Sequence, residues 1–238
     1  MKKIAFLSGL FLFVTCKSVF TDFKTSEAIQ LGTIIKQDGF NSQRNIQHVA
    51  KPVFKQPIPL YVKRTAFTKT SYKSFLRAKE TQNSHLNISF DDSISTRPYY
   101  VRIGILGRVD VLSALANKLN TPVLDFLKTS RKNAIITEVS MAVSPDILEI
   151  LTKSDQIFLR SEHSNNLYAF MHYGEDGDLH KINVKSSVVF GYKRAGFCWE
   201  ETNRQPLKIV DWNYGNKNCP SGSTKDPKKA LKKNELIK

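Results

Sequence analysis

Long hydrophobic runs, cysteines and acidic residues are all scarce in this chain of 238 residues. The longest apolar run, Ile4 to Val14, is too short to span a bilayer core, which needs about 20 residues. No later run approaches that length, so we expect no transmembrane helix. Residues of the hydrophobic class still make up 41% of the chain, which excludes collagen, a coiled coil and a wholly disordered chain.

The first fifteen residues have the pattern of an export signal. Lys2 and Lys3 precede the apolar run, and Cys16 follows it, where a lipoprotein signal has the cysteine that becomes acylated. The stretch that ends at Cys16 resembles the loose lipobox of some bacterial lipoproteins. The resemblance implies that Cys16 carries lipid. The alternatives are an ordinary signal peptide cut near Cys16 to Ser18, which would release a soluble protein, and an uncleaved or cytosolic start.

Cysteine usage also favours export. The chain has 3 cysteines, and lipidation of Cys16 would leave Cys198 and Cys219 free to pair. A disulfide is the expected state of such a pair in an oxidising compartment. The alternative is two free buried thiols.

Basic charge is concentrated outside the middle of the chain. Residues 1–97 hold 15 basic and 6 acidic residues, residues 98–202 hold 12 of each, and residues 203–238 hold 9 and 3. We therefore expect an export signal over residues 1–15, an anchor, linker and basic aromatic segment over residues 16–83, a folded domain over residues 84–219, and a mobile basic tail over residues 220–238.

The middle of the chain has the clearest periodicity. Strand patterns cover Tyr100 to Leu106 and Ala134 to Val143, and helical spacing covers Val109 to Asn120. Further helices are expected from Thr121 and from Ser144-Pro145, followed by strands joined by short turns. This order predicts an α+β fold with an antiparallel or mixed sheet, about three short helices on one face, and basic flanks. An α/β sheet is the second choice. Pro52 to Pro59, with three prolines, disfavours a helix or a central strand.

The stretch from Lys51 to Lys79 carries eight basic residues, five aromatic residues and no acid. Such a segment beside a lipid anchor strengthens binding to anionic membranes. We expect Lys63, Arg64, Lys69 and Lys73 to bind an anionic surface or envelope polymer. Two alternatives are aromatic residues packed on the sheet with solvated lysines around them, and a less favoured nucleic-acid footprint.

Catalytic and metal-binding motifs are weak. His163, His172 and His180 lie near an expected hairpin at residues 174–177. A three-residue loop would place His172 opposite His180, whereas a two-residue loop at Asp176-Gly177 would put them on opposite faces. Metal-ligand spacings such as HExxH or CxxC, a nucleophile elbow and a phosphate-binding loop are missing from the sequence, so we expect no metal and no cofactor. A site of two paired carboxylates could combine Asp91 or Asp92 with Glu138 or Asp110. Only the composition, and no motif, suggests such a site.

The two tryptophans, Trp199 and Trp212, fall inside the expected disulfide loop, where they would cap the core or form a binding platform. The sequence therefore favours an exported, lipid-anchored envelope protein that acts as a binding or structural module, with a membrane surface and a protein as its partners. The alternative is a secreted hydrolase or nuclease that acts on a polyanion, in which His163, His172 or His180 works with Glu138 or Glu162.

Overall fold

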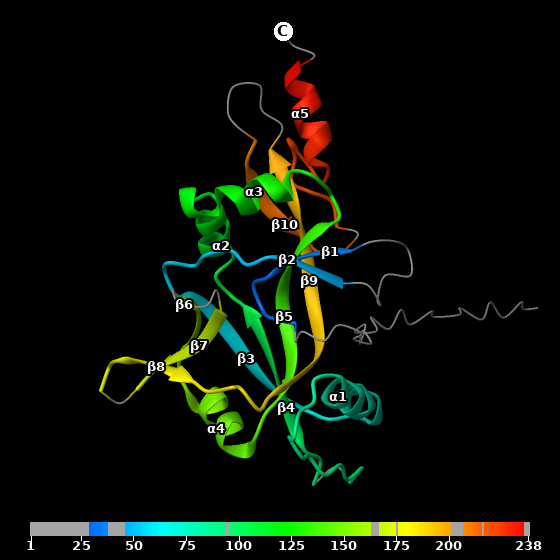
Figure 1. The fold of residues 1–238 in the computed structure, drawn as a ribbon, viewed down its shortest axis with the longest axis vertical. Coiled ribbons are helices and arrows are strands. Elements are labelled where there is room, and N and C mark those ends of the chain that lie inside the picture. Colours follow the sequence, from blue (N-terminus) through cyan, green and yellow to red (C-terminus); the bar gives the residue numbers. More distant parts are fainter. Residues whose placement is uncertain are drawn as a thin grey trace, which may run out of the picture.

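A large antiparallel sheet organises the computed structural model, which describes residues 29–37, 46–93, 96–162, 167–174, 176–200, 207–215 and 217–235 (Figure 1). The strands are β1 Ile34–Gln37, β2 Ile46–Ala50, β3 Ile58–Ala66, β4 Tyr99–Ile105, β5 Asn133–Ala142, β6 Ile157–Glu162, β7 Leu167–Tyr173, β8 Leu179–Ile182, β9 Val188–Glu200, β10 Ile209–Asn213 and β11 Ser223–Thr224. Their order is β10-β9-β5-β4-β3-β6-β7-β8, with β1 on β5, β2 on β1, and β11 on β9. The expected α+β class is confirmed.

The helices exceed the expected number. They are α1 Lys69–Thr81, α2 Arg108–Leu115, α3 Thr121–Leu127, α4 Pro145–Lys153 and α5 Pro227–Glu235, with a 3-10 turn at Lys118–Asn120. The prediction of about three is therefore too low for the described residues alone. A capping box explains the start of α1, because the side chain of Thr68 accepts from the Ser71 amide while the Ser71 hydroxyl accepts from the Thr68 amide. None of the described helices is long and apolar enough to cross a membrane.

The helices lie on both faces of the sheet, not on one as expected. Val111, Leu115, Leu127 and Leu151 of α2, α3 and α4 join the main core on one face. Phe75 and Ala78 of α1 pack instead against a second aromatic cluster on the other face, which contains Phe67, Tyr100 and Phe190. Figure 1 draws α1 and α4 to either side of β4. We call the side of the sheet that carries Tyr61, Lys63, Tyr100, Arg102, Glu138, Ser140 and Lys193 the α1 face.

The sheet also begins earlier in the chain than expected. β3 contains Pro59 and is nevertheless a central strand, paired with β4 on one edge and β6 on the other. Pro59 is tolerated because the β3–β4 ladder begins only at Leu60, so its missing N–H removes no hydrogen bond from that ladder. Its carbonyl accepts from the amides of Leu106 and Gly107, which follow β4. β2 occupies part of the stretch expected to be a polar linker. Phe54, between β2 and β3, is fully buried, so this region contributes to the core.

Residues 220–235 fold as well, where a mobile tail was expected. Ser223 and Thr224 pair with Glu200 and Trp199 of β9, and α5 follows. Asp226 caps that helix, since its carboxylate accepts from the Lys228 amide, and Pro227 fits the first helical position. Ala230 of α5 has no exposed surface and belongs to the main core. This packing against the core helps to hold α5 in place, and the lysine-rich composition of the segment gave no indication of it.

Candidate functional site

Glu138 is the one charged residue of β5, a strand whose ten residues are all buried. Only 6% of its side chain is exposed. A buried carboxylate is costly unless it is hydrogen-bonded and paired with cations. Its surroundings therefore reveal how this face of the sheet is built.

Three side chains donate to the Glu138 carboxylate. Arg102 on β4 donates from Nε and Nη2 to Oε1, at 2.8 and 2.6 Å. Lys193 on β9 donates from Nζ to Oε2 at 3.0 Å. The hydroxyl of Tyr61 on β3 also donates to Oε2. Both carboxylate oxygens are therefore satisfied by groups from three other strands.

The strand registers bring these side chains together. Tyr61 lies opposite Gly104, Gly104 opposite Glu138, and Glu138 opposite Lys193, so one row of residues crosses four strands. Directly opposed residues point to the same side of a sheet. Gly104 has no side chain, which leaves room for the ring of Tyr61 to pass over β4 toward Glu138.

Two irregularities in the β5–β9 ladder lie on either side of the pair Glu138 and Lys193, and the first aligns these two residues. Ile136 pairs with Arg194, yet Glu138 pairs with Lys193, so Thr137 is an extra residue on β5. Continued without this bulge, the register would place Glu138 opposite Tyr192. A second shift leaves Phe190 as the extra residue on β9 and restores the original register. Bulges of this kind commonly re-aim side chains beside functional sites.

The shared hydrogen bonds shift the pKa of each partner. Burial alone would raise the pKa of Glu138, but the hydrogen bonds from Tyr61, Arg102 and Lys193 bring it below its ordinary value. Burial, followed by the hydrogen bond to Glu138, raises the pKa of Tyr61 well above its ordinary value. Glu138 is therefore ionised and Tyr61 is neutral at physiological pH.

The α1 face has more positive than negative charge around Glu138. Arg102 and Lys193 share one carboxylate, and 29% and 50% of their side chains are exposed. Lys63 lies opposite Arg102 and is exposed, and no acidic partner for it occurs among the described residues. This part of the α1 face thus carries three cations and one anion, a surplus of two positive charges. Such an arrangement can bind an anionic group.

The structure does not gather the four predicted anion-binding residues into one patch. Lys63 lies on the α1 face, and Lys73 is exposed on α1, with no acidic partner in the described part of the chain. Lys69 pairs with Asp92 at 2.6 Å. Arg64 points to the opposite face, where its Cζ lies 3.8 Å from the centroid of the Tyr99 ring.

Two of the three histidines meet across a hairpin. His172 on β7 is directly opposite His180 on β8, and their ring centroids are 6.1 Å apart. The Nε2 atom of His180 lies 2.8 Å from Oδ1 of Asp176, which raises the pKa of His180. His163 lies outside the described residues. Among those that are described, no three metal-ligating side chains converge.

The predicted carboxylates are dispersed. Asp91 accepts from Thr96, Asp92 pairs with Lys69 and Arg97, and Asp110 lines a pocket of about 230 Å³ with Lys55. Glu162 pairs with Lys181, and β4, β3 and β6 lie between Glu138 and the histidine hairpin. Three pockets lined by described residues each lack the combination of a histidine, a carboxylate and two basic residues. The hydrolase alternative gains no support from them.

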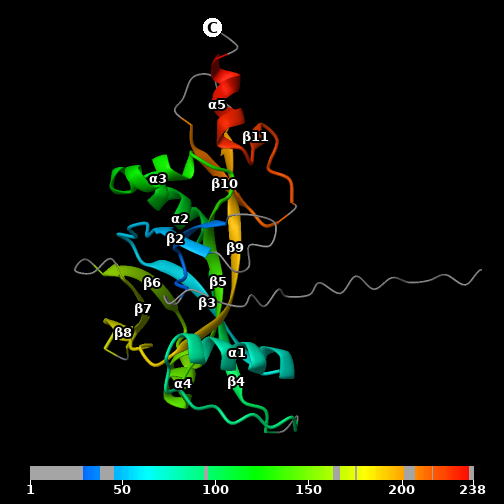
Figure 2. The same ribbon diagram turned by 45° about the vertical axis from the view of Figure 1, so that its right-hand side comes forward.

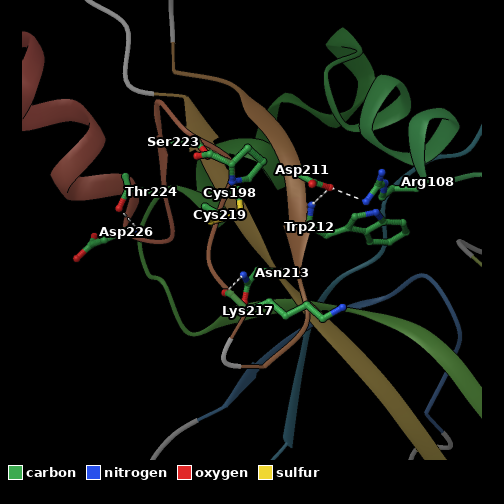
Figure 3. The surroundings of a disulfide bond; sticks show 11 residues. Arg108, Cys198, Asp211, Trp212, Asn213, Lys217, Cys219, Ser223, Thr224 and Asp226 are labelled. Carbon is green, nitrogen blue, oxygen red and sulfur yellow. Dashed lines mark hydrogen bonds and ion pairs between the residues drawn. A yellow bond between two sulfur atoms is a disulfide. The ribbon is translucent and has the colours of Figure 1, made fainter.

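The predicted disulfide is confirmed. Cys198 on β9 is bonded to Cys219, with Cα atoms 5.6 Å apart (Figure 3). Trp199 and Trp212 are both buried in the main core, as one of the two alternatives expected. Figure 3 shows the surroundings, in which Arg108 pairs with Asp211 at 2.9 Å. Cys16, the predicted lipid attachment site, lies outside the described residues.

No family model, curated protein or solved structure matches the chain. The sequence pattern singles out Glu138 and Lys63 but does not show that Tyr61, Arg102 and Lys193 lie beside them. The available signal was a single charge, Glu138, inside the otherwise uncharged run Ala134 to Val143.

Proposed function

We propose that this protein is an exported binding module that holds an anionic surface or polymer of the cell envelope against its α1 face. The observation that carries the proposal is the charge surplus on this face, where Arg102 and Lys193 share the Glu138 carboxylate and Lys63 lies opposite Arg102. Exposed cations near an anionic membrane contribute about 1 kcal/mol each. The net charge of +15 supports the same partner class by drawing the whole chain toward anions.

Export is supported by the Cys198–Cys219 bond, because such bonds persist in oxidising compartments and are rare in the cytosol. We further propose that Cys16 carries the lipid that anchors the protein. Substituting Cys16→Ser would then move the protein from the detergent phase to the aqueous phase in a phase-partition experiment. If the native protein already partitions into the aqueous phase, Cys16 carries no lipid anchor.

The binding function is tested with the Cys16→Ser chain and vesicles of phosphatidylglycerol or phosphatidylcholine. We expect binding to phosphatidylglycerol alone, weakening as salt rises, because exposed charges are screened beyond about 8 Å at 0.15 M. The variant Lys63→Gln/Lys193→Gln should bind about 30-fold more weakly, at about 1 kcal/mol for each lost charge. Lys118→Gln/Lys153→Gln, with the same net charge but its changes away from the α1 face, is the control. Equal losses in both variants, or equal binding to both lipids, would contradict the proposal.

A further inference from the structure

The donors around Glu138 are only partly used. Arg102 binds the carboxylate through Nε and Nη2, and no hydrogen bond from its Nη1 is described. Lys193 uses one of its three N–H groups on Glu138. Among the described residues, no acceptor engages the ammonium group of Lys63. The free donors outnumber those that Glu138 occupies.

These free donors belong to adjacent side chains. Arg102 and Lys193 are neighbours because they bind the two oxygens of one carboxylate. Lys63 is beside Arg102, as the two are directly opposed on β3 and β4 and point to the same side. Glu138 fixes the guanidinium of Arg102 through two hydrogen bonds to Oε1. The site is therefore partly preorganised before any ligand arrives.

The wall of the site is aromatic. The ring of Tyr61 lies over Gly104, and 37% of this residue remains exposed. Its hydroxyl is occupied by Glu138, so the exposed part of Tyr61 is chiefly its ring. A flat apolar wall beside a cluster of cations suits an anionic group that is attached to a carbon skeleton.

We propose that the α1 face contains a binding site for a phosphate monoester, held by Lys63, Arg102 and Lys193 beside the ring of Tyr61. The dianion of a monoester matches the two positive charges that Glu138 leaves unbalanced. Its three terminal oxygens match three cationic donors, of which the planar guanidinium is best suited to phosphate. A phosphate diester or a carboxylate carries one charge and would leave one cation unpaired.

This inference rests on the proposed function and names the ligand class of the same face. The source of the monoester is either a lipid headgroup or a soluble or polymer-borne sugar phosphate. The chemistry at the site is shared, so small phosphates are used to test the site and vesicles to separate the sources.

The test is a titration of the Cys16→Ser chain, followed by NMR, with methyl phosphate and dimethyl phosphate at 0.15 M salt. We expect saturable shifts of the Arg102 Nε–H and Tyr61 ring signals with methyl phosphate, and binding of dimethyl phosphate about tenfold weaker. Lys63→Gln should weaken methyl phosphate binding about tenfold while leaving the fold intact, because this exposed lysine has no acidic partner among the described residues. Lys118→Gln, which removes the same charge elsewhere, should have no effect. Arg102→Lys, which keeps the charge but loses the bidentate fork, should also weaken binding.

Linear shifts that never saturate, equal binding of the two phosphates, or equal effects of Lys63→Gln and Lys118→Gln would overturn the site. If phosphatidylglycerol vesicles are still bound in a salt-dependent manner in that case, the proposed function stands and only the monoester site fails. Given saturable binding, a preference for phosphatidic acid over phosphatidylglycerol vesicles supports a lipid headgroup. Equal binding of these vesicles supports a soluble or polymer-borne phosphate, and both results support the site.

Discussion

The ring of Tyr61 occupies the space above Gly104 that a side chain on β4 would need. Tyr61 and Gly104 are directly opposed, and Gly104 is in turn opposite Glu138. The missing side chain is what allows a tyrosine on β3 to reach a carboxylate two strands away. The hydrogen bond from Tyr61 to Glu138 therefore depends on the absence of a side chain at Gly104.

Substituting Gly104→Ala should displace the Tyr61 ring and break its hydrogen bond to Glu138. We expect the free energy of unfolding to fall by about 1–3 kcal/mol, as for other overpacking substitutions. Denaturant unfolding measures this change. The control is the same substitution in a Tyr61→Ala chain, where the clash is gone and the cost should be much smaller. An equal cost in both chains would show that the Tyr61 ring is not the obstacle.

Substituting Glu138→Gln should lower stability by about 3 kcal/mol at pH 7, because it removes the carboxylate from a buried charge pair. The partial exposure of the Lys193 and Arg102 side chains keeps the loss at the lower end of the range for buried pairs.

The pH dependence of this loss has a definite sign. The pKa of Glu138 in the folded protein is below its ordinary value of 4.5, so its stabilisation is complete above that pH and disappears as pH falls through the folded value. The stability difference between the native chain and Glu138→Gln should therefore shrink as pH falls below the ordinary value of 4.5 and through the lower pKa of the folded state. A difference that stays constant from pH 7 to the acid limit would show that Glu138 is not held by charge.

Removing the disulfide should loosen the end of the sheet. The double substitution Cys198→Ser/Cys219→Ser should cost about 2–4 kcal/mol, since the bond closes a loop with a sequence separation of 21 residues. Hydrogen exchange should accelerate in β10, β11 and α5 before it does in β3 and β4. A reducing agent should destabilise the native chain and leave the double variant unchanged. If reduction leaves the native melting temperature unchanged, the bond contributes no stability.

Asp176 should control the titration of His180. The hydrogen bond from His180 to Asp176 raises the pKa of the imidazole above its ordinary value of 6.5. Asp176→Asn should lower that pKa, as followed by the ring proton signals in NMR, while the neighbouring His172 serves as the internal comparison. An unchanged pKa of His180 would mean that the carboxylate contact does not persist in solution.

Local signals predicted much of the secondary structure. Ser144 and Pro145 marked the start of α4, and the alternation from Tyr100 marked β4. The reach of the fold beyond residues 84–219 was missed for two different reasons. Pro59 argued against a central strand. A proline is tolerated in a sheet only where its missing N–H is not needed for pairing with a neighbouring strand, and the sequence alone does not show where that is. The many lysines of α5 indicated a solvated tail, although one residue among them, Ala230, is buried.

The site was harder to predict than the fold because it is made by pairing across strands. Tyr61, Arg102, Glu138 and Lys193 come from four strands far apart in the sequence, and only the sheet order makes them neighbours. The bulge at Thr137 shifts the register by one residue, and periodicity in a single strand does not reveal it. The cysteine pairing was predictable because few cysteines leave few choices.

NMR mapping of the Cys16→Ser chain on nanodiscs that contain phosphatidylglycerol tests most directly whether the α1 face is the surface that meets an anion. We expect the signals of Lys63, Arg102, Gly104 and the Tyr61 ring to change first, and high salt to reverse the changes. Changes confined to the β7–β8 hairpin or to α3, with the Tyr61 ring unaffected, would contradict it.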